Sequence, residues 1–281
     1  MPTASATAPI GVCDSGIGGL TVLRELAARL PHEDFLYLGD SARLPYGTKN
    51  PGDVVRCSLE IAATLMESRI KMLVIACNTI TAPALPVLRR QYPHIPIIGV
   101  IEPGVTAACA ISKNGIIALI ATQGTINSGA YQNGIRALRP DAEVLDAACP
   151  LFVMLAEEGI LEGEVAEAVA RHYLAGIFNR PGKPAPDSLL FGCTHFPPLG
   201  PAIAKGLGVT PFFVNPAANT AEAAATALRE RGTGNPDARR KGTIVLCTTA
   251  PEAGSFARAG GILLGRPIAG QDVRLVSLKE I

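Results

Sequence analysis

No CxxC pair occurs in this sequence, and the seven cysteines, an odd number, are scattered at positions 13, 57, 77, 109, 149, 193 and 247. A disulfide framework or a zinc knuckle needs cysteines at paired spacings, so we expect neither, and no metal site. Thiols of this kind are typical of a reducing compartment, where each is either buried or reactive. We therefore expect a cytoplasmic protein.

The chain also lacks an excess of charge, since 25 basic and 24 acidic residues leave a formal net charge of +1. Nucleic-acid binding usually needs a basic patch, and the short run at 239–241 is more typical of a solvated loop. No apolar stretch is long and uninterrupted enough to span a membrane, and the first ten residues have no signal-peptide character. We expect neither a nucleic-acid partner nor a membrane association.

What the sequence does contain is a regular alternation of short apolar runs with longer amphipathic segments. "PIGVCDS" predicts a strand and "GLTVLRELAARL" a helix, and the alternation continues along the 281 residues. This pattern predicts the α/β class, with two similar domains, each a mainly parallel sheet flanked by helices. We assign residues 1–100 plus 210–281 to the first domain, with "DVRLVSL" as a returning strand, and residues 101–209 to the second.

Ligands of open parallel sheets bind outside the carboxyl ends of the strands, so the residues after each strand are the candidates for chemistry. These positions are mostly polar or reactive. They are Asp14 and Ser15; Pro45, Tyr46 and Gly47; Cys77, Asn78 and Thr79; Thr122 and Thr125; and Cys193, Thr194 and His195.

Two strand ends resemble each other: "LVIACNT" and "LLFGCTH" both run from an apolar strand through a small residue to a cysteine and hydrogen-bonding residues. Taken alone, a cysteine at such a place is most often a small buried hydrophobe. A matched pair, one in each domain, instead predicts two thiols that face each other across an interdomain cleft. Pro197 and Pro198 are expected to stop the second strand.

The glycine-rich "DSGIGG" after the first strand is either a tight strand-to-helix turn or an anion cradle at a helix N-terminus. It matches neither GxGxxG nor GxxxxGK[ST], which argues against a nucleotide site. Cys193 and His195 have a spacing that matches no common zinc pattern.

Seven motifs in the same order resemble the glutamate racemases of the aspartate/glutamate racemase superfamily: "GVCDSGIGGLTVLREL", "YLGDSARLPYG", "VIACNTITA", "GVIEPG", "IATQGTINSGAY", "CPLFVMLAEEG" and "FGCTHFPPL". The resemblance implies two α/β domains with the active site in the cleft between them. It also implies an enzyme without a cofactor that interconverts L- and D-glutamate and supplies D-glutamate for peptidoglycan and thus for cell shape, and we expect a homodimer.

The resemblance further implies roles for individual residues. Cys77 and Cys193 would be the acid/base pair, with Cys77 acting on D-glutamate and Cys193 on L-glutamate. Asp14 would assist Cys77, and Glu157 and His195 would assist Cys193. The substrate would be bound by Asp14, Ser15, Pro45, Tyr46, Gly47, Asn78, Thr79, Thr122, Thr125, Thr194 and His195.

Racemisation breaks a Cα–H bond and re-forms it from the opposite face, so two bases on opposite sides need no motion. Near-attack geometry places each sulfur about 3–3.5 Å from Cα, and hence the two sulfurs roughly 6–7 Å apart. No lysine lies in a pyridoxal-like setting, so fixed donors must stabilise the carbanion. The open alternatives are a two-cysteine racemase for aspartate or a hydantoin, a nonenzymatic regulator with the same cleft, and a thiol redox protein.

Overall fold

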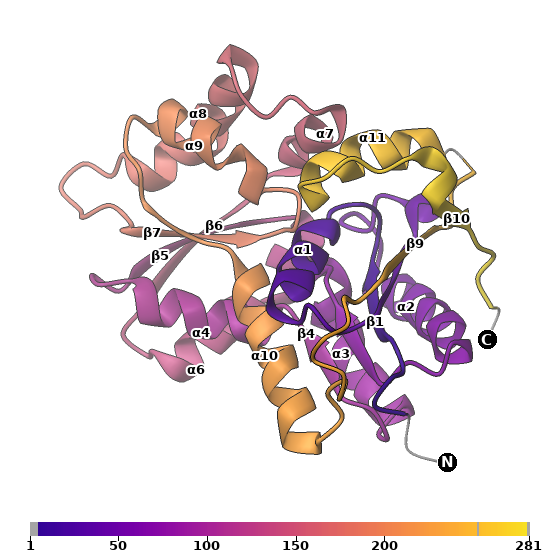
Figure 1. Ribbon diagram of the computed structural model, residues 1–281. Helices are drawn as coiled ribbons and strands as arrows, with labels where there is room; N and C mark the ends of the chain where they lie inside the picture. The colour runs from indigo at the N-terminus through magenta and orange to yellow at the C-terminus, as the bar shows by residue number, and fades with distance from the viewer. Residues whose placement is uncertain (1–4, 252, 280–281) are drawn as a thin grey trace.

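The chain forms two lobes, each built on its own parallel sheet, in the computed structural model, which describes residues 5–251 and 253–279 (Figure 1). Helices cover both faces of each sheet. The predicted α/β class, with two similar domains, is therefore confirmed.

The sheet of the first lobe has six strands, all parallel. Two inner strands, at 10–14 and 72–75, are buried along their whole length, as is typical of a parallel sheet with helices on both faces. The spatial order of the six strands is β10 (Val273–Leu275), β9 (Ile244–Thr248), β2 (Phe35–Gly39), β1 (Ile10–Asp14), β3 (Met72–Ile75) and β4 (Ile97–Gly99).

Two hydrophobic clusters hold the helices on this sheet, one on each face. One face packs against α1 (Leu20–Arg29), α10 (Pro216–Arg231) and α11 (Ala253–Leu264), and the other against α2 (Pro51–Glu67) and α3 (Asn78–Gln91). Helix α2 begins at a proline, and the Asn50 side chain caps it by accepting the backbone N–H of Asp53.

The sheet of the second lobe has four parallel strands in the order β6 (Glu143–Ala148), β5 (Ile116–Ala121), β7 (Ser188–Gly192) and β8 (Phe212–Val214). Its two faces are covered, respectively, by α7 (Pro150–Glu158), α8 (Glu164–Phe178) and α9 (Gly200–Leu207), and by α4 (Ile101–Ile111) and α6 (Ala130–Leu138). The short helix α5 (Gln123–Ser128) links β5 to α6.

The chain crosses between the lobes in two places. The first crossing leads from β4 into α4. The second follows β8, which pairs with β7, so the second sheet extends past residue 209 to Val214. The returning strand β10 pairs with β9 of the first sheet, as expected from the sequence. The exact division of the chain into domains stays a prediction.

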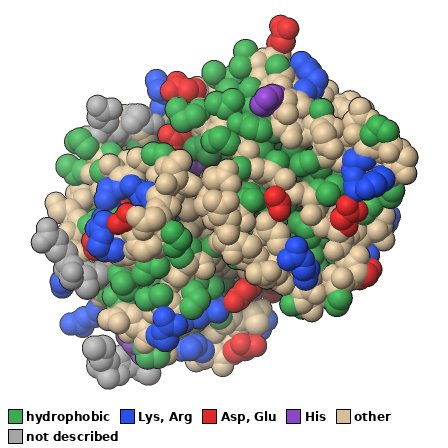
Figure 2. Space-filling model, turned by 180° about the vertical axis from the view of Figure 1, so that it is seen from behind, with side chains coloured by type: hydrophobic (Ala, Val, Ile, Leu, Met, Phe, Trp, Pro, Cys, Tyr) green, Lys and Arg blue, Asp and Glu red, His purple; other side chains and the backbone are tan. Residues whose placement is uncertain are grey.

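Within residues 5–251 and 253–279, no helix is both long enough and apolar enough to cross a membrane. The face in Figure 2 carries Lys and Arg side chains interspersed with Asp and Glu.

Candidate active site

A cavity of about 190 Å³ lies between the lobes, at the carboxyl ends of the strands. Eleven of the residues predicted from the sequence line it: Ser15, Pro45, Tyr46, Gly47, Cys77, Asn78, Thr79, Thr122, Cys193, Thr194 and His195. Three others do not line the cavity but lie next to residues that do: Asp14 directly precedes Ser15, Thr125 contacts Thr79, and Glu157 contacts His195.

Cys77 stands on the first lobe, where β3 ends and α3 begins one residue later. The side chain is buried, and its thiol donates to the Ser15 hydroxyl at 3.5 Å. Burial raises the pKa of Cys77 to about 12, and the charge of Asp14 acts in the same direction. At neutral pH this residue is therefore a thiol, able to give a proton.

Asp14 is fully buried at the end of β1. Its Oδ2 accepts the backbone N–H of Gly16 at 3.0 Å, and the backbone of Gly19 lies near enough to lower the pKa of the carboxylate. Oδ1 has no hydrogen-bond partner in the described part of the chain. Burial raises the pKa of Asp14, while His195 and these amides act in the opposite direction.

The anion that the "DSGIGG" turn binds is therefore the carboxylate of Asp14, a residue of the turn itself. Of the two interpretations that the sequence left open, the tight turn fits better: the Gly16 amide donates to Asp14, and Ser15 is the one residue of this turn that lines the cavity.

Cys193 stands on the second lobe directly after β7, which ends at Gly192. The strand thus ends before the two prolines, which lie in a 3₁₀ turn at Pro197–Leu199. The expectation that these prolines stop the strand is wrong, because the chain has already left the sheet at Cys193.

His195 links the second thiol to a carboxylate. Its Nδ1 lies 3.8 Å from Cys193 Sγ, and its Nε2 lies 3.0 Å from Glu157 Oε1 at the end of α7. Burial alone lowers the pKa of His195, but the hydrogen bonds with Cys193 and Glu157 outweigh it and raise the pKa to about 10. The imidazolium is therefore the form present at neutral pH, so a cation lies beside the Cys193 sulfur.

The two thiols lie within electrostatic reach of each other, because the charge of Cys193 also contributes to the raised pKa of Cys77. Both belong to free cysteines. The Cys77 sulfur lies near the carboxylate of Asp14, whereas the Cys193 sulfur lies beside the imidazolium of His195. The two sulfurs therefore have neighbours of opposite charge.

The lobes touch closely around Gly18 of the first lobe. A Cβ at this position would lie 2.3 Å from Thr194 Oγ1 and 2.6 Å from both Cε1 and Nδ1 of His195, so only glycine fits. The Thr21 hydroxyl donates to the Thr194 carbonyl at 3.2 Å across the same boundary.

Three threonine hydroxyls form a second link between the lobes. Thr79 of α3 lies 2.8 Å from Thr122 Oγ1 and 3.3 Å from Thr125 Oγ1, and Thr122 donates to Thr125 at 3.1 Å. These bonds join the beginning of α3 to the beginning of α5.

The sequence did not point to seven residues of the cavity wall, five of which are apolar. The residues that it missed are Leu44, Thr48, Gln123, Pro150, Leu151, Val153 and Met154. Four of them lie on α7, directly after β6, so the rule that sites lie at strand ends would have found them had it been applied to that strand.

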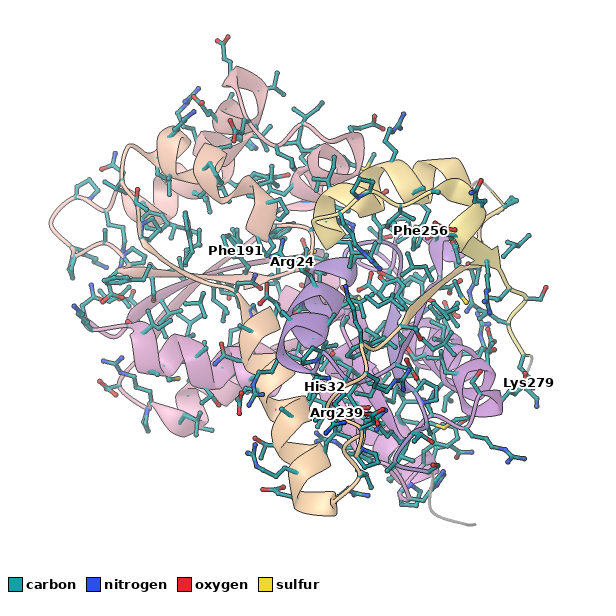
Figure 3. The ribbon with its side chains drawn as sticks, viewed as in Figure 1. Arg24, His32, Phe191, Arg239, Phe256 and Lys279 are labelled. Atoms are coloured by element: carbon teal, nitrogen blue, oxygen red, sulfur yellow. The ribbon has the colours of Figure 1, made fainter. Side chains whose placement is uncertain are left out.

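A second hollow, of about 560 Å³, lies on another side of the interlobe boundary and contains no thiol. Arg24 of α1 and Phe191 of β7 face it from the two lobes (Figure 3). In the described part of the chain, no group of three or more His, Cys, Asp or Glu side chains is placed to hold a metal ion.

Known proteins resemble this chain over nearly its whole length. A family model for Asp/Glu/hydantoin racemase matches residues 10–227. The glutamate racemase of Geobacter metallireducens is 44% identical over 270 residues, which are 96% of this chain and 97% of that protein.

Solved structures agree. The glutamate racemase of Francisella tularensis, in complex with D-glutamate, has a TM-score of 0.85 at 34% identity and covers 97% of this chain and 98% of its own. That of Thermus thermophilus, in complex with beta-chloro-D-alanine, has a TM-score of 0.84 at 41% identity, with 99% and 100% covered.

The fold and the cavity define a two-lobed α/β enzyme with one thiol from each lobe at its site. The chain belongs to the Asp/Glu/hydantoin racemase family, which confirms the resemblance seen in its motifs.

Proposed function

We propose that this chain interconverts L- and D-glutamate by a two-base mechanism in which Cys77 and Cys193 act from opposite sides of the cavity. The observation that carries the proposal is the meeting of these two thiols, from equivalent strand ends of the two lobes, at one cavity. The glutamate racemases to which the chain is similar support glutamate as the substrate.

In the direction from L- to D-glutamate, the Cys193 thiolate takes the Cα proton and the Cys77 thiol gives its own proton to the opposite face of the carbanion. The step leaves Cys193 as a thiol and Cys77 as a thiolate. After product release, Cys193 gives its proton to water and Cys77 takes one from water, which restores the starting state for the next L-glutamate. The neighbours of the two sulfurs match these roles. His195, beside Cys193, is a cation, and Asp14, near Cys77, contributes a negative charge that keeps Cys77 protonated.

The carbanion needs stabilisation because a thiol is far more acidic than a Cα–H bond. Removal of the proton spreads negative charge onto the α-carboxylate, so fixed donors aimed at that carboxylate lower the barrier. The hydroxyls of Ser15, Thr79 and Thr194 and the amide of Asn78 line the cavity and are the proposed donors. Asp14 lies directly behind Ser15 of the cavity wall, and its Oδ1, which has no hydrogen-bond partner in the described part of the chain, is the proposed partner of the substrate ammonium group.

The wider setting belongs to the same proposal. We infer a cytoplasmic homodimer that works without a cofactor and supplies D-glutamate for peptidoglycan. Pro45, Tyr46, Gly47, Thr122 and Thr125 complete the proposed substrate site, the first four in the cavity wall and Thr125 behind Thr122.

Circular dichroism of L-glutamate incubated with the purified protein, without added cofactor, tests this function. The proposal predicts loss of optical activity with the parent and with a Cys109→Ala control, since Cys109 lies outside the cavity. With the Cys77→Ala, Cys193→Ala double variant, the optical activity of L-glutamate should not change.

Activity that persisted in the double variant would contradict the two-base mechanism. Faster turnover of aspartate or a hydantoin than of glutamate would make the substrate wrong. A redox protein would instead gain a Cys77–Cys193 disulfide on mild oxidation, visible as a mass loss that maps to this pair.

A further inference from the structure

Tyr131 reaches across the lobe boundary to a residue of the proposed substrate site. It stands on α6 of the second lobe, is fully buried, and donates its hydroxyl to Asn78 Oδ1 at 2.6 Å. Asn78 opens α3 of the first lobe and lines the cavity, whereas Tyr131 lies outside the cavity wall.

The Tyr131 ring is held in place from several sides. It packs among buried side chains of α4 and β5, including Val105 and Ile117. Gly104 leaves room for it, because a Cβ at that position would lie 3.0 Å from the Tyr131 hydroxyl oxygen and 3.1 Å from Cε1. Burial raises the pKa of Tyr131, and the charge of Cys193 adds to the rise, so the phenol keeps its proton and remains a donor.

A donor fixed at Oδ1 determines which way the Asn78 amide faces. An asparagine side chain carries an acceptor oxygen and a donor NH₂ on the same carbon, so anchoring one sets the direction of the other. No acceptor for Asn78 Nδ2 is present in the described part of the chain, and the residue is at the cavity surface. Its NH₂ group is therefore available to a ligand.

We propose that Tyr131 is a positioning residue, which turns the Asn78 amide so that its NH₂ donates to the α-carboxylate of the substrate. The inference rests on the proposed racemisation of glutamate. Asn78 directly follows Cys77, whose sulfur must approach Cα, and the α-carboxylate is one bond from Cα. Because negative charge grows on that carboxylate in the transition state, the donor is worth more there than in the bound substrate.

The test is a double-mutant cycle measured as kcat/KM for glutamate. The variants are Tyr131→Phe, Asn78→Ala and the two combined, with Tyr92→Phe as a matched control. Tyr92 is a half-buried tyrosine at the opposite end of α3, so its hydroxyl is removed far from the cavity.

We expect Tyr131→Phe to lower kcat/KM about tenfold, mostly through kcat, and Tyr92→Phe to leave it unchanged. In the Asn78→Ala background, Tyr131→Phe should have no further effect, because the amide that it orients is gone.

Equal losses from Tyr131→Phe in both backgrounds, or a loss within twofold of Tyr92→Phe, would overturn the proposal. Thermal melts set an assay temperature below every transition, so the ratio in the two backgrounds decides even if a variant is less stable. A parent protein that does not racemise glutamate would refute the proposed function instead, independently of this cycle.

Discussion

Gly18→Ala is expected to damage the site without touching either thiol. The added Cβ would lie 2.6 Å from two atoms of the His195 ring, and ordinary contact begins at 3.4 Å, so the ring must move by about 0.8 Å. The ring cannot yield freely, because Glu157 holds one nitrogen at 3.0 Å and Cys193 lies 3.8 Å from the other.

Two magnitudes follow from this clash. Overpacking of a tight contact costs about 1–3 kcal/mol of stability, and each kcal/mol corresponds to about 2–4 °C of Tm for a chain of this size class. A misplacement of about 1 Å at a catalytic group costs about 100-fold in rate. We therefore expect a modest fall in Tm but a loss of about two orders of magnitude in kcat/KM for L-glutamate.

The matched control is Gly176→Ala, at an exposed position in the last turn of α8. A Cβ there meets nothing within 4 Å, so alanine should raise the stability by about 0.5–1 kcal/mol and leave the rate unchanged. Racemisation by Gly18→Ala within threefold of the parent would refute the reasoning, because His195 would then tolerate displacement.

Three further changes test other parts of the account. Glu157→Gln should lower the pKa of His195 from about 10, so the loss of activity as pH rises should begin at lower pH in a pH–rate profile; an unchanged alkaline limb would contradict this. Cys77→Ser and Cys193→Ser should each lose nearly all activity in both directions, since a hydroxyl is a much poorer base, and near-parent rates in either would count against the mechanism. Lys71→Met should lower the free energy of unfolding by about 3–5 kcal/mol in denaturant titrations, because it leaves the Glu33 carboxylate buried without the ammonium group that lies 2.6 Å away. The value of kcat/KM should not change, since Lys71 precedes β3 and the cavity follows that strand. An unchanged unfolding midpoint would show that the ion pair contributes nothing to stability.

The sequence was sufficient for the parts of the site that depend on local order. Cys77 and Cys193 each follow a continuous apolar run, and parallel strands bring their carboxyl ends to one edge of the sheet. Both thiols and their immediate neighbours could therefore be predicted before the structure.

The contacts that cross the lobe boundary could not be predicted in this way. The approach of Gly18 to His195 and the bond from Tyr131 to Asn78 depend on how two separately folded sheets pack together. No periodicity or spacing encodes that packing. The same holds for the buried ion pair of Lys71 and Glu33, which the sequence shows only as two ordinary charged residues.

The most direct test of the two-base mechanism is the position of deuterium early in the reaction of L-glutamate in deuterium oxide. With one base on each face, the first D-glutamate formed should carry deuterium at Cα while the remaining L-glutamate keeps its protium, as followed by NMR together with chiral separation. D-Glutamate that retains the original protium, or L-glutamate that exchanges as fast as product forms, would show that a single base serves both faces and would contradict the assignment of Cys77 and Cys193.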